Sequence, residues 1–148
     1  MKSSPLTLLL ADDDKDDCIF FKEALDEIPV ATELVTVNDG VQLMELLVRE
    51  GANLPFVLYL DLNMPLKNGF DALHEIKSNE KLKDLPVIMF STSFTQKVAD
   101  QLQQQGAKYY MQKPAEFENL KKIIHRSLIL TMENQNKEIN EEDFLIVP

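Results

Sequence analysis

The sequence lacks both the cysteine pairs that stabilise secreted proteins and the long apolar runs that build membrane spans. It contains one cysteine, Cys18, so an internal disulfide is excluded and the chain suits a reducing cytosol. No apolar run approaches the roughly 18 residues needed to cross a bilayer. The apolar segment 6–11 is too short for a signal peptide and leads directly into aspartates. These absences predict a cytoplasmic protein.

Positive charge is also scarce. Fifteen lysines and arginines stand against 25 aspartates and glutamates, which gives a net charge of -10. Nucleic acid binding requires clustered basic side chains, so no direct nucleic acid partner is expected. An anionic membrane surface is disfavoured for the same reason. Part of the acidic excess lies in residues 131–148, where five acids accompany Lys137 alone.

Five short apolar segments alternate with longer segments of helical periodicity, which is typical of an α/β protein with a buried parallel sheet. The expected strands lie near 6–11, 33–37, 56–60, 86–91 and 108–112. The expected helices lie near 16–28, 40–50, 69–78, 95–105 and 116–130. Right-handed crossovers place helices on both faces of such a sheet, so we expect a doubly wound (βα)5 fold in three layers.

Residues suited to phosphoryl chemistry follow four of the expected strands. The first strand ends at Asp12, Asp13 and Asp14, the third at Asp61, the fourth at Ser91 and the fifth at Lys113. Parallel strands place their carboxyl ends at one edge of the sheet, where open α/β folds bind ligands. We therefore expect these side chains to converge in one shallow site.

The acids of this set predict a site for a divalent cation. Asp12, Asp13 and Asp61 would repel one another at short range, and a hard cation relieves that repulsion. Mg2+ suits the site because it usually accepts one or two carboxylates and keeps several waters. The backbone carbonyl of Asn63, two residues beyond Asp61, could be a further ligand. For Asp12 and Asp13 alone, the alternative is a helix N-terminal run favoured by the helix dipole.

Asp61 is the expected nucleophile. It directly follows five apolar residues, which is a poor place for a merely solvated side chain. A carboxylate can attack phosphorus and form an aspartyl-phosphate, and catalysis then consists mainly of positioning and charge neutralisation. Lys113 would supply a cation for the phosphoryl oxygens, and Ser91 would supply a hydroxyl donor.

The ordered motifs resemble the receiver domain of bacterial two-component response regulators. The matching segments are Leu-Leu-Ala-Asp12-Asp13-Asp14, Asp61-Leu-Asn-Met-Pro65, Gly69, Ile-Met-Phe-Ser91 and Tyr110-Met-Gln-Lys113-Pro114. The resemblance covers residues 5–130 and is that of a stand-alone, single-domain type. It implies a flavodoxin-like three-layer sandwich with the parallel strand order 2-1-3-4-5.

The resemblance also implies a role for each site residue. Asp61 would be the phospho-acceptor, modified to 4-aspartylphosphate, with Asp12 and Asp13 at the Mg2+ site. Ser91 and Tyr110 would be the switch pair, and Lys113 would contact the phosphoryl group. Two details depart from the commonest pattern of the family. Thr92 follows the switch serine where a smaller residue is frequent, and Asp14, Asp16 and Asp17 extend the acid cluster.

The partners implied by the resemblance are proteins. A sensor histidine kinase or a phosphotransfer protein would supply the phosphoryl group, and the receiver would assist its own phosphorylation and dephosphorylation without being an enzyme in the ordinary sense. A downstream target would bind near the helix at 95–105, the strand at 108–112 and the helix at 116–130. A homodimer is a further possible assembly. We expect no output module, because little chain follows residue 130.

The main enzyme alternative is a haloacid-dehalogenase-like phosphatase. That family places an aspartate nucleophile after its first strand, in an Asp-x-Asp pattern that Asp12 and Asp14 satisfy. It would leave Asp61 unexplained, and turnover of small phosphate esters would discriminate it. A second alternative is an interaction module that works without phosphorylation, but such degenerate receivers usually lack an acid or the lysine.

Residues 131–148 form an acidic C-terminal tail with an apolar end at Phe144-Leu145-Ile146-Val147. We expect a disordered tail, because chain termini usually fray. The alternative is that the apolar end docks, either as an added strand on an exposed sheet edge or in a groove of a second subunit.

Overall fold

Six parallel strands form one sheet in the computed structural model, which describes residues 4–49, 51 and 53–148. The strands are β1 (Leu6–Ala11), β2 (Thr32–Val37), β3 (Val57–Leu60), β4 (Val87–Ser91), β5 (Tyr109–Gln112) and β6 (Leu145–Ile146). The order is β2-β1-β3-β4-β5-β6, so the expected order 2-1-3-4-5 is confirmed and one strand is added at the edge.

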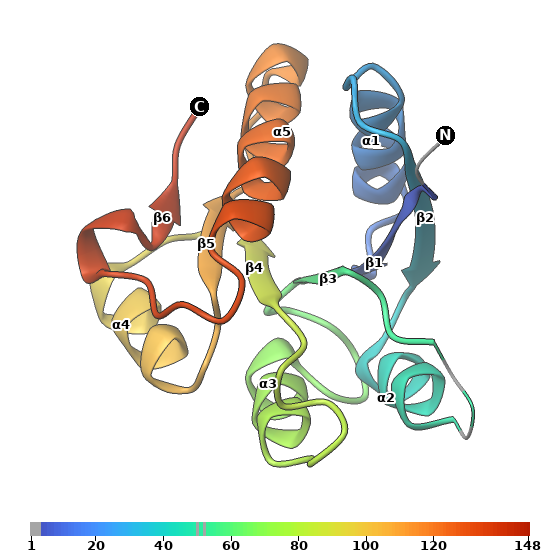
Figure 1. Cartoon of the computed structure of the whole chain (residues 1–148), viewed down its shortest axis with the longest axis vertical. Helices are drawn as coiled ribbons and strands as arrows, with labels where there is room; N and C mark the ends of the chain where they lie inside the picture. The colour runs from blue at the N-terminus through green and yellow to red at the C-terminus, as the bar shows by residue number, and fades with distance from the viewer. Residues whose placement is uncertain (1–3, 50, 52) are drawn as a thin grey trace.

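The helices lie in two layers, one on each face of the sheet (Figure 1). They are α1 (Lys15–Asp26), α2 (Gly40–Val48), α3 (Gly69–Lys77), α4 (Gln96–Gln104) and α5 (Phe117–Glu133), with a short 3-10 turn, η1 (Glu141–Asp143). Helices α1 and α5 cover one face, and α2, α3 and α4 cover the other. Residue 50, the expected end of the second helix, lies outside the described residues. No helix within the described ranges has both the length and the apolar character needed to cross a membrane.

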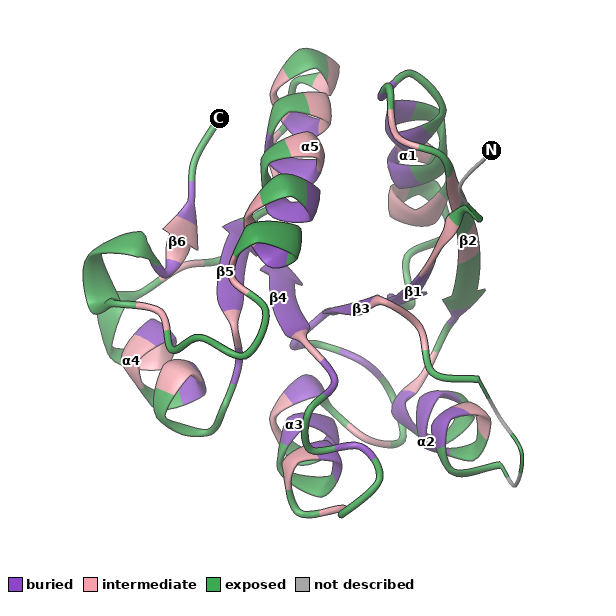
Figure 2. Ribbon diagram, viewed as in Figure 1, coloured by how far each residue is buried: buried purple, intermediate pink, exposed green. Residues whose placement is uncertain are grey.

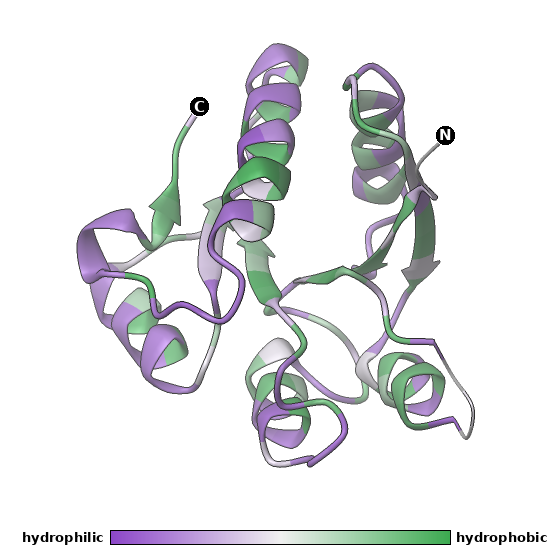
Figure 3. Ribbon diagram, viewed as in Figure 1, coloured by the Kyte–Doolittle hydropathy of each residue, from purple (hydrophilic) through white to green (hydrophobic). Residues whose placement is uncertain are grey.

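Two apolar cores lie between the sheet and its helices, one on each face of the sheet. Side chains of a strand point alternately to the two faces, so Leu8 and Leu10 pack with α1 and α5, while Leu9 packs toward α2. The central strands β3 and β4 are buried at every residue, whereas only Val37 is buried in the edge strand β2 (Figure 2). The helices accordingly turn hydrophobic stripes to the sheet and polar residues to solvent (Figure 3).

The C-terminal end of the chain is docked, so the expected disordered tail is wrong for this segment. Strand β6 pairs with β5, and the Tyr110 backbone N–H donates to the Phe144 carbonyl at 2.9 Å. Phe144 is buried on the α4 side of the sheet and Ile146 on the α5 side. The added-strand alternative therefore describes the segment, and the sheet edge it uses belongs to the same chain.

Phe144→Ala should lower the free energy of unfolding by about 3–5 kcal/mol, because it removes a buried aromatic ring from the core. Phe144 is 3% exposed, whereas Val147 of the same segment is 50% exposed. Val147→Ala is therefore the matched control, with an expected change within about 0.5 kcal/mol. Urea unfolding followed by circular dichroism would measure both. Equal, small effects of the two substitutions would mean that the tail is not held in solution.

Candidate functional site

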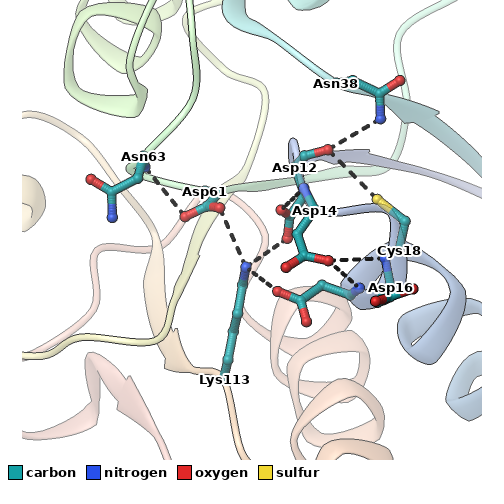
Figure 4. Close-up of polar contacts among 9 residues, drawn as sticks. Asp12, Asp14, Asp16, Cys18, Asn38, Asp61, Asn63 and Lys113 are labelled. Carbon is teal, nitrogen blue, oxygen red and sulfur yellow. Dashed lines mark hydrogen bonds and ion pairs between the residues drawn. The ribbon is translucent and has the colours of Figure 1, made fainter.

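The carboxyl ends of β1, β3, β4 and β5 meet at one edge of the sheet and bring the expected side chains together. The ammonium of Lys113 lies 2.7 Å from Asp12 Oδ2 and 3.3 Å from Asp61 Oδ2 (Figure 4). The backbone N–H of Lys113 donates to the Ser91 carbonyl at 2.8 Å, which ties the ends of β4 and β5 together. Strand-end residues that are 101 positions apart in the chain, Asp12 and Lys113, thus share one contact.

The loop after β3 places Asp61 through a close backbone approach that requires glycine. The Gly69 N–H donates to the Leu62 carbonyl at 2.9 Å. A Cβ atom at position 69 would lie 2.4 Å from the carbonyl oxygen of Asp61, which no side chain can satisfy. Gly69, at the start of α3, therefore lets the helix pack directly behind the expected nucleophile.

Asp12 is held from several sides. Its Oδ1 accepts a hydrogen bond from the Asp14 N–H at 3.0 Å, and its backbone carbonyl accepts bonds from Asn38 Nδ2 at 3.2 Å and Cys18 Sγ at 3.6 Å. Burial raises the pKa of the Cys18 thiol to about 11, and the charge of Asp12 adds to the rise, so the thiol stays protonated and can donate. The sequence pattern assigned neither Asn38 nor Cys18 to the site.

The electrostatics of the site reflect several carboxylates around one ammonium. Burial raises the pKa of the Asp12 carboxyl from 3.8 to about 6, although Lys113 and the Asp14 N–H oppose the rise. Burial by itself lowers the pKa of Lys113, but its hydrogen bonds to Asp12 and Asp17 outweigh that effect, and the net shift is upward. Lys113 is therefore a fixed positive charge, and the acids around it carry an excess of negative charge.

Three carboxylates of this site can converge on one cation. Asp12, Asp13 and Asp61 each offer an oxygen, and these oxygens lie within 4.8 Å of one another. Hard carboxylate oxygens are the donors that Mg2+ and similar divalent cations prefer, so the residues fit such an ion. Asn63 lies beside them, where its backbone N–H donates to Asp61 Oδ1 at 3.3 Å. A metal contact from the Asn63 carbonyl remains a prediction.

Ser91 and Tyr110 lie next to the acid site, on β4 and β5. The Ser91 hydroxyl is buried and has no hydrogen-bond partner among the described residues. Tyr110 is fully buried, and its hydroxyl donates to the Ser93 carbonyl at 2.5 Å. The Tyr110 ring packs edge-on against Phe94 at 5.4 Å and against Phe144 of the tail at 6.5 Å. Tyr110 thus connects the loop after Ser91 to the docked C-terminal segment.

Asp14 and Asp17 do not act as the sequence suggested. Asp14 is the N-cap of α1, and its side chain accepts the backbone N–H groups of Asp16 and Asp17 at 2.9 and 3.1 Å. An Asp-x-Asp phosphatase site would need the Asp14 carboxylate for chemistry instead. Asp17, which was only an extra acid in the sequence, forms an ion pair with Lys113 at 2.9 Å.

Comparison with known proteins identifies a family and relatives that agree with the geometry of this site. The family model of the response regulator receiver domain matches residues 8–125. The response regulator Rcp1 of Synechocystis sp. is 37% identical over 93 residues, which cover 60% of this chain and 63% of Rcp1, slightly less than two thirds of that relative.

Two solved structures resemble the chain over most of its length. The phosphorylated cyanobacterial phytochrome response regulator RcpA matches with a TM-score of 0.79 at 33% identity, covering 87% of this chain and 95% of that one. The Mn2+-bound form of Rcp1 matches with a TM-score of 0.75 at 28% identity, covering 92% and 99%.

Proposed function

This chain belongs to the response regulator receiver domain family of two-component signalling, and on that premise we propose that it is a phospho-accepting switch. Asp61 takes a phosphoryl group from a sensor histidine kinase or a phosphotransfer protein, and the altered surface is bound by a downstream target protein. The observation that supports this best is the contact of Lys113 with Asp61, beside two further carboxylates that can share a cation.

The residues of the site supply the steps of phosphoryl transfer. An oxygen of Asp61 attacks the phosphorus atom of the donor and becomes the bridging oxygen of an acyl phosphate, while the bond from phosphorus to the donor breaks and the donor departs as the leaving group. The ammonium of Lys113 neutralises charge on the phosphoryl oxygens. The Ser91 hydroxyl, buried without a partner among the described residues, is free to donate to one of those oxygens. The receiver thereby assists its own phosphorylation and its later hydrolysis.

The cation of the proposal is Mg2+, which Asp12, Asp13, Asp61 and the carbonyl of Asn63 would hold. When bound, it would neutralise carboxylate and phosphoryl charge and would orient the phosphoryl oxygens. The Mn2+-bound form of the relative Rcp1 supports a divalent cation in a receiver of this type. The mutual approach of three carboxylate oxygens in this chain supports the same conclusion independently.

The output surface of the proposal comprises α4, β5 and α5. A phosphoryl group adds a charge of about -1.5 to -2, and Ser91 reaches it by moving toward Asp61. Tyr110, on the neighbouring strand β5, is buried. Phosphorylation would then act as a population shift, so some of the active form should exist before it. Strand β6 lies along β5 on the same side of the molecule as α4 (Figure 1), so a target would meet the docked tail as well.

Beryllofluoride, a phosphoryl mimic, should shift the amide NMR signals of residues 91–112 more than those of residues 33–50 when Mg2+ is present. The reason is that β4 and β5 carry Ser91 and Tyr110, whereas β2 lies at the opposite edge of the sheet. Asp61→Asn should remove the response in both regions. Equal shifts, or larger shifts in residues 33–50, would place the switch on another face.

A further inference from the structure

Lys113 has one more acidic neighbour than its role toward Asp61 requires. Its ammonium lies 2.9 Å from Asp17 Oδ2, a shorter distance than the 3.3 Å to Asp61 Oδ2. Asp17 is not among the three carboxylates whose oxygens converge on a common point. The side chain of Lys113 is 9% exposed and that of Asp17 is 35% exposed, so the pair lies at the rim of the site and not in open solvent.

The first turn of α1 directs Asp17 toward Lys113. The Asp14 cap binds the N–H groups of both Asp16 and Asp17, so both acids have a fixed backbone and the same relation to the helix dipole. Asp17 forms the ion pair with Lys113, whereas the exposed Asp16 has no ion pair within the part of the chain that the structure describes. The two neighbours thus differ mainly in their contact with the lysine.

We propose that Asp17 is a positioning residue that holds the Lys113 ammonium toward α1 and thereby limits how fully the lysine serves a phosphoryl group on Asp61. This rests on the proposed function of Asp61. A lysine ammonium has three N–H donors, and Asp12, Asp17 and Asp61 lie around it. A phosphoryl group on Asp61 adds acceptor oxygens, and Asp17 competes with those oxygens for the N–H donors of Lys113.

The negative charge of Asp17 should affect Mg2+ binding and phosphorylation in opposite directions. In the free protein, Asp17 attracts a cation to the site and draws Lys113 away from Asp12 and Asp61, so both effects favour Mg2+. Once Mg2+ is saturating, the same carboxylate repels an anionic phosphodonor and withholds Lys113 from it. Asp17→Asn should therefore weaken Mg2+ binding but speed phosphorylation. A substitution that merely damaged the site would weaken both functions together.

The test compares Asp17→Asn with Asp16→Asn, which removes a neighbouring charge from the same helical turn. Calorimetric titration with Mg2+ should show affinity lower by about 3-fold to 10-fold in Asp17→Asn, and intact-mass kinetics with acetyl phosphate at saturating Mg2+ should show labelling faster by a similar factor. The side-chain NMR signal of Lys113 Nζ should move in Asp17→Asn alone. Asp17→Glu, which keeps the charge, should restore wild-type behaviour in each measurement.

Two results would overturn the role of Asp17. One is equal behaviour of Asp17→Asn and Asp16→Asn in Mg2+ affinity and labelling rate. The other is a parallel loss of both properties in Asp17→Asn, which would indicate a structural role. If the wild-type protein accepts no phosphoryl group at all, the function proposed for Asp61 fails instead. The Mg2+ titration and the Lys113 signal would then still decide whether Asp17 positions the lysine.

Discussion

Asp61→Asn should abolish phosphoryl uptake from acetyl phosphate. The wild-type protein should gain the mass of one phosphoryl group in the presence of Mg2+. An asparagine amide is neutral and cannot act as the nucleophile that forms an acyl phosphate. The site around it should persist, because asparagine has nearly the shape of aspartate and Lys113 keeps its contacts with Asp12 and Asp17. Intact-mass spectrometry would measure the loss as complete disappearance of the added mass.

The control for this variant is Asp71→Asn, in an exposed position of the first turn of α3. It should be labelled like the wild-type protein. Full labelling of Asp61→Asn would move the acceptor to another residue. Sustained release of phosphate from small esters by the wild-type protein would favour the phosphatase alternative, since a receiver accepts one group and releases it slowly.

Asp13→Ala should abolish both Mg2+ stabilisation and phosphorylation. Asp13 is exposed, so its loss should leave the core intact, but it removes one of three converging carboxylates. For the wild-type protein, a ligand at 100 times its dissociation constant should raise stability by about 2.7 kcal/mol, because it binds only the folded chain. Without metal, Asp13→Ala should be more stable than the wild-type protein, since a like charge beside Asp12 and Asp61 is gone.

Thermal unfolding with Mg2+ and with a chelator would measure this response. Asp16→Asn serves as the control, because it also lowers the acidic charge near α1 and leaves the three converging carboxylates in place. It should keep most of the Mg2+ response. An unchanged response in Asp13→Ala would exclude Asp13 as a ligand of the cation.

The core of the fold could be predicted because its strands are buried on both faces. A segment such as Val57–Leu60 is apolar at every position and is followed directly by the charged Asp61, so its end is visible in the sequence. The docking of Phe144 was not predictable in the same way. It depends on the open edge of β5, where the Tyr110 N–H needs an acceptor, and a local apolar run carries no information about that edge.

The site could be predicted where its residues directly follow the strands. Asp12, Asp61 and Lys113 converge because parallel strands share an edge. Asp17 and Asn38 were missed because they lie on a helix and in a loop, where the direction of a side chain depends on how the element packs. Asp14 shows the reverse case: its neighbours suggested chemistry, but its carboxylate is used to cap α1.

Borohydride reduction of the phosphorylated protein would identify the phospho-acceptor directly. The reagent converts an aspartyl acyl phosphate to homoserine, and peptide sequencing by mass spectrometry then locates the changed residue. We expect homoserine at position 61 alone, only after incubation with acetyl phosphate and Mg2+. Homoserine at position 12 or 14, or at any position other than 61, would contradict the assignment of Asp61 as the acceptor.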